Sequence, residues 1–345
     1  MNIDILTEEK RELLLSIVND NERFVVVGHK SPDGDAVGSC LAWACYLREV
    51  WGKDATVVMP DSCPDFLHWL PDSHTIVRQD KHRETVEALF DKADVIFCLD
   101  LNQSSRTELM QPLLDNAKAQ KVLIDHHLDP QMETALTLSH PEMCSTSELV
   151  FRIVWQLGDF AKMPRRWAEQ VYCGMMTDTG GFTFNSTRPE IFFIISQMLT
   201  KGIDKDKIYR NVYNNYSQWA VRLRGYVMAQ KLNYYEDLHA AYFATTRMDM
   251  DEYNYVKGDA EGLVNVPLTI KGVKLSISLR EDNKQDNLVW VSVRSVDDFP
   301  ANEVAAQFFN GGGHLNAAGG HLYCSLNEAC QIAREAIKAW ADRLK

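Results

Sequence analysis

The sequence has no uninterrupted run of the roughly 18 apolar residues that a membrane-spanning helix requires. Its first residues are charged and lack the apolar core of a secretory signal peptide. None of the eight cysteines belongs to a Cys-x-x-Cys pair, and several lie within apolar runs. We therefore expect a cytoplasmic protein with no membrane contact, whose cysteines are buried and reduced rather than paired in disulfides or bound to zinc.

Positive charge is also scarce, since the formal net charge is -12. This balance argues against a broad basic surface for long duplex nucleic acid. The negative net charge is compatible with a small anionic substrate, because the charges around the binding site decide whether such a substrate binds. The sequence also lacks repeats and low-complexity segments, and its glycines match neither the dinucleotide-binding pattern nor the P-loop.

What is present indicates an α/β protein. A chain of 345 residues, 46% of them hydrophobic, is long enough for two domains with cores of their own. In the first half, short apolar runs alternate with helical patterns, which implies a parallel sheet with helices on both faces. Ser145 and Glu148 fit a capping box at the start of one helix. The predicted strands are 24–28, 55–59, 94–99 and 121–124, and the predicted helices are 36–50, 81–91 and 147–157.

The chain changes character after a helical stretch that Gly202 interrupts. Residues 216–231 fit one long connecting helix, without the Gly/Ser content of a flexible linker. Strands are then predicted over 240–246, 274–279 and 288–293, and helices over 304–309 and 326–344. We therefore assign residues 1–190 to an α/β domain, 191–232 to a helical connector and 233–345 to a smaller α/β domain.

Side chains that bind metals follow three of the predicted strands. Because the carboxyl ends of parallel strands meet at one edge of a sheet, where ligands collect, we expect these side chains to converge. Each carboxylate alone has a simpler explanation as a turn or a helix cap, and we expect Asp35 to be such a cap. Two adjacent imidazoles diverge, so one is expected to bind metal and the other to face substrate. The residues are His29, Asp33 and Asp35 after the first strand, Asp100 after the third, and Asp125, His126 and His127 after the fourth.

Three further segments carry candidate residues. Asp178 follows a helical stretch, and a carboxylate at a helix C-terminus needs a compensating partner such as a cation. Gly311-Gly312-Gly313-His314 precedes an expected helix and presents bare N–H groups to a phosphate or carboxylate. Arg294-Ser295 ends a strand and offers a planar cationic fork. A helix-end turn, a flexible glycine loop and a surface arginine are the alternatives that the residues leave open.

Taken together and in this order, the motifs resemble the DHH phosphoesterase superfamily in its two-domain form with a DHHA1 domain. The resemblance covers nearly the whole chain. Its most similar group is that of short oligoribonucleases and phosphatases of 3′-phosphoadenosine 5′-phosphate (pAp). Four motifs of the first domain match His29/Asp33/Asp35, Asp100, Asp125-His126-His127 and Asp178, and the DHHA1 signature matches Gly311–His314 with Ala317-Ala318-Gly319.

The resemblance implies two bound Mn²⁺ ions, with Mg²⁺ or Co²⁺ as alternatives. One ion would take His29, Asp33 and Asp100, and the other Asp35, Asp100, His126 and Asp178. Asp125 would orient a neighbour and His127 would contact the reacting phosphate. Because four aspartates offset the charge of two divalent ions, other positive groups are needed for the substrate. The substrate-binding candidates are Arg106, Arg294, Ser295, Gly312, Gly313 and His314.

The function implied is hydrolysis of short oligoribonucleotides or pAp-like nucleotide phosphates to nucleoside monophosphates. Three alternatives stay open at this point. They are a phosphodiesterase for cyclic dinucleotides or pApA, a phosphoanhydride hydrolase for polyphosphate or pyrophosphate, and a non-catalytic scaffold. A scaffold is disfavoured because a degenerate member is expected to lose metal ligands, and this chain keeps all six. A homodimer is neither required nor excluded.

Overall fold

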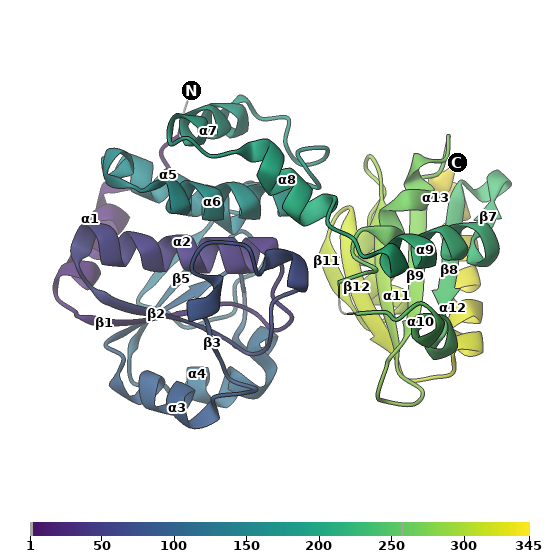
Figure 1. Ribbon diagram of the computed structural model, residues 1–345, viewed down its shortest axis with the longest axis horizontal. Helices are drawn as coiled ribbons and strands as arrows, with labels where there is room; N and C mark the ends of the chain where they lie inside the picture. The colour runs from purple at the N-terminus through teal and green to yellow at the C-terminus, as the bar shows by residue number, and fades with distance from the viewer. Residues whose placement is uncertain (1–2, 257) are drawn as a thin grey trace. The chain divides into compact units, whose positions relative to one another are not determined.

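A computed structural model describes residues 3–256 and 258–345, in two compact units that divide between Asn215 and Tyr216 (Figure 1). Among these residues, no helix combines the length and the apolar character needed to span a bilayer. All eight cysteines are free thiols. How the chain divides into functional domains stays a prediction.

The first unit is built on a six-stranded parallel sheet with the order β3-β2-β1-β4-β5-β6. The four predicted strands are β1, β2, β4 and β5, each correct to within one residue at either end, so the predicted parallel sheet is confirmed. The two missed strands are short edge strands with too few residues for a recognisable pattern. The bounds are β1 Arg23–Val27, β2 Asp54–Met59, β3 Val77–Arg78, β4 Val95–Leu99, β5 Gln120–Asp125 and β6 Leu136–Ser139.

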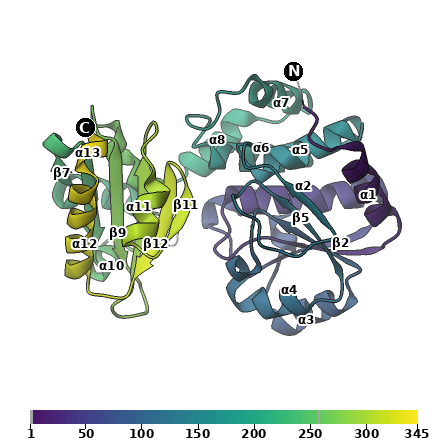
Figure 2. The same cartoon turned by 180° about the vertical axis from the view of Figure 1, so that it is seen from behind.

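Helices cover both faces of this sheet (Figures 1 and 2). Val25 and Val27 of β1 pack with α3 and α4, whereas Phe24 and Val26 enter a larger core with the other helices. Because both faces of β1 are buried from Phe24 onward, the strand is apolar after Arg23. The helices are α1 Glu8–Asn19, α2 Gly34–Trp51, α3 Arg83–Lys92, α4 Gln111–Asn116, α5 Thr146–Gln156, α6 Arg165–Asp178, α7 Pro189–Thr200 and α8 Lys205–Tyr213, with short 3₁₀ helices η1 Asp65–Leu67, η2 Ser73–Thr75, η3 Ser104–Met110 and η4 Phe160–Lys162.

The start of α5 differs in one detail from the predicted capping box. Ser145 is the N-cap, and its Oγ accepts a hydrogen bond from the backbone N–H of Glu148 at 3.0 Å. The Glu148 carboxylate, however, accepts from the N–H of Cys144 at 2.8 Å rather than from the cap residue. The helix therefore begins as predicted, with the glutamate bonded one residue further back.

The second unit contains a six-stranded mixed sheet with the order β11-β12-β10-β9-β8-β7. Its β8 and β9 are parallel, and the other neighbouring pairs are antiparallel. The predicted strands correspond to β8, β9 and β10, while the three others were missed. The bounds are β7 Asn233–Tyr235, β8 Ala240–Thr245, β9 Leu275–Glu281, β10 Val289–Ser295, β11 Gly312–His314 and β12 Ala317–Leu322.

Helices α11 and α12 bury one face of this sheet, and a smaller apolar cluster that includes Leu223, Phe243 and Leu263 covers part of the other. The long helix predicted after residue 216 is α9 followed by one π-helical turn, and the predicted C-terminal helix is interrupted at Trp340. The bounds are α9 Gln218–Tyr226, η5 Val227–Lys231, η6 Glu236–Leu238, α10 Arg247–Glu252, η7 Leu263–Thr269, α11 Ala301–Phe308, α12 Leu326–Ala339 and α13 Ala341–Leu344.

The glycine run does not open a helix, and that prediction was wrong. Gly312 to His314 form β11, which pairs with β12 in a hairpin. A Cβ atom at Gly311 would stand 1.9 Å from the carbonyl oxygen of Gly319, so a side chain cannot be accommodated there. These glycines permit a close approach of two backbones rather than forming a helix N-terminus.

Candidate metal centre

The predicted metal ligands meet at the carboxyl edge of the first sheet. Strands β1, β4 and β5 are direct neighbours there, so the residues that follow them converge. Four of the six candidates are almost fully buried, Asp33 is exposed and Asp178 is partly exposed. The structure therefore brings together, within one unit, the residues His29, Asp33, Asp35, Asp100, His126 and Asp178.

Asp100 lies at the centre of this group. Its Oδ2 is 3.6 Å from Nε2 of His29, and its Oδ1 is 3.5 Å from Nε2 of His126. Two ligand atoms that bind the same ion, each at about 2.1 Å, stand about 3–4 Å apart. Each oxygen of Asp100 can therefore share an ion with a different imidazole. The backbone of Asp100 has φ 59°, a left-handed conformation that aspartate tolerates better than most residues.

The remaining carboxylates fall on either side of Asp100. Asp33 Oδ1 is 3.9 Å from Nε2 of His29. On the other side, Asp178 Oδ2 and Asp35 Oδ2 lie 3.5 Å and 3.9 Å from Nε2 of His126. The result is two clusters that have Asp100 in common. This is the same division into two ligand sets that the resemblance implies.

Asp33 and not Asp35 caps α2, so the predicted cap was wrong. The Asp33 Oδ1 accepts hydrogen bonds from the backbone N–H groups of Asp35 and Ala36, both at 3.0 Å. The helix begins at Gly34, where a Cβ would stand 2.3 Å from Oγ1 of Thr177 on α6. This close contact of α2 with α6 brings Asp35, in the first turn of α2, near the last turn of α6.

The N-terminus of α5 holds Asp35, which sequence reasoning missed. The backbone N–H groups of Thr146 and Ser147 donate to Oδ2 and Oδ1 of Asp35 at 2.7 and 2.9 Å. The Thr146 hydroxyl also donates to Oδ1 of Asp100 at 3.1 Å. A helix N-terminus stabilises a carboxylate through its unpaired N–H groups. The cap signal at Ser145 was the one clue in the sequence to this positioning contact.

Burial and mutual repulsion dominate the electrostatics of the carboxylates. Burial, with the charges of Asp100 and Asp178, raises the pKa of Asp35 well above its ordinary value. Burial also raises the pKa of Asp178 to about 7, although His126 opposes the shift. Burial would raise the pKa of Asp100 too, but hydrogen bonds with His126 and His29 bring it well below the ordinary value.

These carboxylates lack basic partners of the ordinary kind. In the part of the chain that the structure describes, Asp35, Asp100 and Asp178 form no ion pair with lysine or arginine. Burial lowers the pKa of His126, but the three carboxylates raise it well above its usual range overall. Buried carboxylates whose basic partners are imidazoles fit a site for divalent cations, because the cation supplies the missing positive charge.

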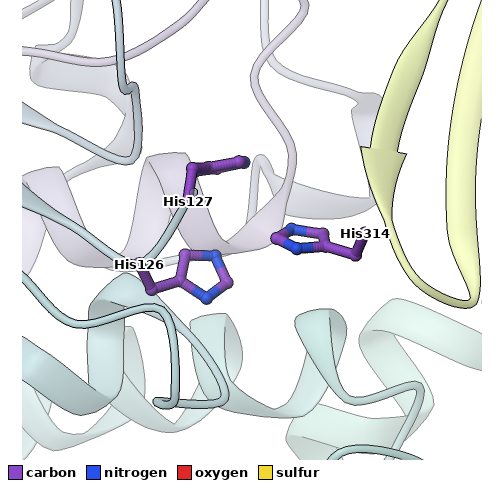
Figure 3. Close-up of side chains that lie close together, drawn as sticks. All are labelled: His126, His127 and His314. Atoms are coloured by element: carbon purple, nitrogen blue, oxygen red, sulfur yellow. The ribbon is translucent and has the colours of Figure 1, made fainter. Parts of the chain in front are cut away.

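His127 lies beside His126 (Figure 3) but has different partners. Its ring is 4.9 Å from that of His126, with the planes 69° apart. Asp125 is fully buried, and its Oδ1 lies 2.8 Å from Nδ1 of His127. Because a carboxylate only accepts hydrogen bonds, Nδ1 carries the proton and donates a hydrogen bond to Asp125. The pair therefore fixes one tautomer of His127.

Arg106, in η3, completes this corner of the unit. Its Nη1 donates to the carbonyl oxygen of Asp100 at 3.2 Å and lies 2.8 Å from Nε2 and 3.3 Å from Nδ1 of His127. An atom on the lone-pair axis of one ring nitrogen would be much further from the other nitrogen. The guanidinium therefore lies against the face of the imidazole, which places a fixed positive charge beside the carboxylate cluster.

The candidate residues of the second unit lie on β10 and β11. Arg294 is half-buried, and its Nη1 donates to the carbonyl oxygens of Val293 and Ala318 at 3.0 and 3.1 Å. The Ser295 hydroxyl donates to the carbonyl of Phe299 at 2.6 Å, which favours a structural role for it. In β11, Gly312 and Gly313 are exposed and His314 is half-buried.

Comparisons with known proteins find a family domain in each of the two units. The DHH family, N-terminal domain matches residues 23–175, and the DHHA1 domain matches residues 240–341. The bifunctional oligoribonuclease and PAP phosphatase NrnA of Thermus thermophilus is 26% identical over 332 residues, which cover 96% of this chain and 94% of that protein. A "probable manganese-dependent inorganic pyrophosphatase" of Streptococcus suis is 28% identical over 160 residues, covering 46% and 48% of the two chains.

A solved structure is more similar still. The exopolyphosphatase-related protein of Bacteroides fragilis is 44% identical, with a TM-score of 0.93, and the match covers 99% of this chain and 98% of that one. The resemblance read from the motifs is thereby confirmed along the whole chain. The chain is a member of the DHH family of phosphoesterases and carries a DHHA1 domain after its DHH domain.

Proposed function

We propose that this chain hydrolyses phosphoester bonds in short oligoribonucleotides and in pAp, releases nucleoside monophosphates, and works in the cytoplasm with two Mn²⁺ ions. The observation that carries the proposal is the position of Asp100, whose two oxygens each face a different buried imidazole. The substrate class is supported by the similarity to the Thermus thermophilus protein, and manganese by the similarity to the Streptococcus suis protein. Mg²⁺ and Co²⁺ are the alternatives for the ion.

The two clusters suit hard divalent ions. His29, Asp33 and Asp100 would hold one ion, and Asp35, Asp100, His126 and Asp178 the other. Ligation by mainly oxygen atoms with one imidazole per ion favours Mn²⁺-like ions over structural zinc. Such a pair, when bound, supplies Lewis-acid activation and neutralises charge on a transferring phosphoryl group.

The neighbouring side chains would meet the substrate. Asp125 keeps the proton on Nδ1 of His127, which leaves the other ring nitrogen to contact the reacting phosphate. Arg106 brings a permanent positive charge to the same place. That charge matters because four aspartates already balance two divalent cations, so the carboxylate cluster offers no surplus attraction for phosphate oxygens.

The DHHA1 residues would bind the end of the substrate that does not react. Arg294 offers a guanidinium, His314 an imidazole, and the exposed residues Gly312 and Gly313 their backbone N–H groups, on neighbouring parts of one sheet. Ser295 would instead orient Asn316, which donates to its hydroxyl. We expect Arg294→Ala and His314→Ala to raise KM for a dinucleotide. Both should matter much less for bis-p-nitrophenyl phosphate, which has no distal phosphate. Equal losses on both substrates would contradict this role.

The experiment that tests the function is a substrate panel with the purified chain and Mn²⁺. It contains pAp, ribonucleotides of two to five residues, pApA, a cyclic dinucleotide, pyrophosphate and polyphosphate. We expect turnover of the short oligoribonucleotides and of pAp, its loss after treatment with a chelator, and its recovery on adding Mn²⁺. Asp100→Asn, assayed in parallel, excludes a contaminating nuclease. Full turnover without divalent metal would contradict the two-ion proposal.

A phosphoanhydride hydrolase is the second candidate. The solved relative is described as exopolyphosphatase-related and the Streptococcus suis protein as a pyrophosphatase, which favour this chemistry. The pyrophosphatase similarity, however, covers only 46% of this chain. Faster turnover of polyphosphate or pyrophosphate than of any nucleotide in the panel would establish this second function instead.

A further inference from the structure

One face of the second sheet carries an aromatic group that the proposed function does not use. Alternate residues of β10 enter the core beneath α11 and α12, so Trp290, Ser292 and Arg294 face the opposite side. The cluster around Leu263 covers β8 on that side, and η7 packs on β9 and β10. Trp290 nevertheless remains 42% exposed.

Three rings form the aromatic edge, which we define as Trp290, His321 and Tyr323. His321 is the cross-strand partner of Trp290, and its ring lies 6.1 Å from the indole and 5.2 Å from the phenol of Tyr323. Tyr323 is 69% exposed. The indole is held in place, because its Nε1 donates to Oδ2 of Asp282 at 2.8 Å. Trp290 and Tyr323 are thus exposed, and the indole is fixed on the sheet, which limits the entropy lost on binding.

Small residues separate the aromatic edge from Arg294. Ser292 pairs with Gly319 across the strands, so the surface between Trp290 and Arg294 carries one hydroxymethyl group and one bare backbone. Trp290 and Arg294 are four steps apart on the strand, a separation of about 13 Å. An extended chain whose phosphate met Arg294 could therefore lie along the pair of Ser292 and Gly319 and reach the aromatic edge.

The chemistry of the surface favours nucleic acid bases over a protein partner. Around the rings stand the guanidinium of Arg280, the Asp282 carboxylate and the hydroxyls of Ser278 and Ser292. An apolar protein face would leave these groups desolvated and unpaired. A base offers a flat apolar face to stack on a ring and polar edges for hydroxyls and water, and stacking tolerates any sequence.

We propose that the aromatic edge is a stacking site for a distal base of a single-stranded oligonucleotide, which makes the enzyme prefer longer substrates over pAp. The proposal rests on the proposed function and adds the determinant of substrate length. In pAp the single base lies between the two phosphates, so no base extends the roughly 13 Å beyond the phosphate at Arg294 that reaching this edge requires. The site therefore acts only on substrates with additional nucleotides.

The test is the ratio of kcat/KM for a pentaribonucleotide to kcat/KM for pAp. Loss of a base–aromatic contact costs about tenfold or more in affinity. We expect the ratio to fall about tenfold in Trp290→Ala and to recover in Trp290→Phe. Tyr323→Ala, a change at an exposed side chain, tests the same site if Trp290→Ala does not fold. Trp219→Ala is the matched control, since Trp219 is another exposed tryptophan of this unit, stacked with Arg222.

The outcomes separate the two proposals. A lower ratio in both aromatic variants, with an unchanged ratio in Trp219→Ala, supports the stacking site. An unchanged ratio in Trp290→Ala and Tyr323→Ala, or an equal fall on pAp and pentanucleotide, overturns it and leaves the proposed function intact. If the unsubstituted protein hydrolyses neither substrate, the proposed function itself is wrong.

Discussion

The guanidinium of Arg106 lies against the imidazole of His127, with Nη1 2.8 Å from Nε2 and 3.3 Å from Nδ1. The buried carboxylate of Asp125 accepts a hydrogen bond from Nδ1 of the same ring. His127 is thus held between a positive and a negative group and oriented by both. This arrangement differs from that of His126, whose Nε2 faces only carboxylates among the contacts described. Adjacent histidines therefore have distinct surroundings, which suits them to different roles.

Arg106→Lys should lower kcat while leaving the metal content unchanged. Lysine keeps the charge but not the flat fork that lies on His127 and donates to the carbonyl of Asp100. Removal of one donor that stabilises a transition state typically costs about 10²–10³-fold in kcat. Steady-state kinetics and metal analysis of the same sample check this. A normal kcat in Arg106→Lys would show that charge alone is required at this position.

Replacing each histidine separately should distinguish metal binding from catalysis. We expect His126→Ala to lose one ion, because its Nε2 faces three carboxylates. His127→Ala should retain both ions and lower kcat by about 10²–10⁴-fold, the usual range for a group that acts on protons or charge at the reacting atoms. Metal stoichiometry decides the matter. One ion lost in His127→Ala, with two kept in His126→Ala, would mean that the assignments are reversed.

Asp100→Asn should be among the most damaging changes of a ligand. Its two oxygens face the imidazoles of the two clusters, so the substitution replaces one ligand oxygen with NH2 and removes the negative charge that both clusters share. Loss of an outer-shell partner costs about 10–100-fold, and loss of a shared ligand should exceed the upper end of that range in kcat. Metal analysis should find fewer than two ions, and circular dichroism should show an intact fold. Near-normal kcat in the folded variant would remove Asp100 from the reaction.

How far the sequence could predict this molecule depended on burial. The central strands β1, β4 and β5 are apolar because both of their faces are covered, so they and the ligands after them were predictable. The contacts of Thr146 and Ser147 with Asp35 were not, because backbone N–H groups leave no mark on residue types. The hairpin of β11 and β12 was missed for a related reason. A glycine run is equally compatible with a loop, a helix N-terminus and a close pair of strands.

Raising the pH should destabilise the metal-free protein. In the unfolded chain Asp178 loses its proton near pH 4, whereas burial raises its folded-state pKa to about 7. Between these values the folded state binds more protons, so the free energy of unfolding falls as the pH rises. His126 acts in the same direction, because its raised pKa favours the folded state at low pH and this contribution disappears as the pH rises.

Thermal unfolding in the presence of a chelator measures this effect. We expect Tm to fall between about pH 5 and about pH 7.5, and the fall to be smaller in Asp178→Asn, which cannot ionise. Mn²⁺ should reverse the trend in the unsubstituted protein, because the ion competes with protons and binds better as the pH rises. A fall of the same size in Asp178→Asn would show that another group is responsible.

Gly311, just before β11, and Gly312, its first residue, allow an effect on stability to be distinguished from an effect on substrate binding. A Cβ at Gly311 would stand 1.9 Å from the carbonyl oxygen of Gly319, whereas a Cβ at Gly312 would meet no atom within 4 Å. Gly311→Ala should therefore destabilise the second unit by about 1–3 kcal/mol, the usual cost of overpacking. Gly312→Ala should leave Tm nearly unchanged, because its Cβ enters open space on an exposed edge strand.

The same pair tests whether β11 approaches the substrate. If a phosphate comes close to the N–H of Gly312, the added methyl group obstructs it, and KM for a dinucleotide should rise in Gly312→Ala while metal content and Tm stay constant. Trp219→Ala serves again as the control for an exposed change in this unit. An unaltered KM in the stable Gly312→Ala variant would show that the glycine run is required only for the pairing of β11 with β12, and the substrate contacts would then have to come from Arg294 and His314.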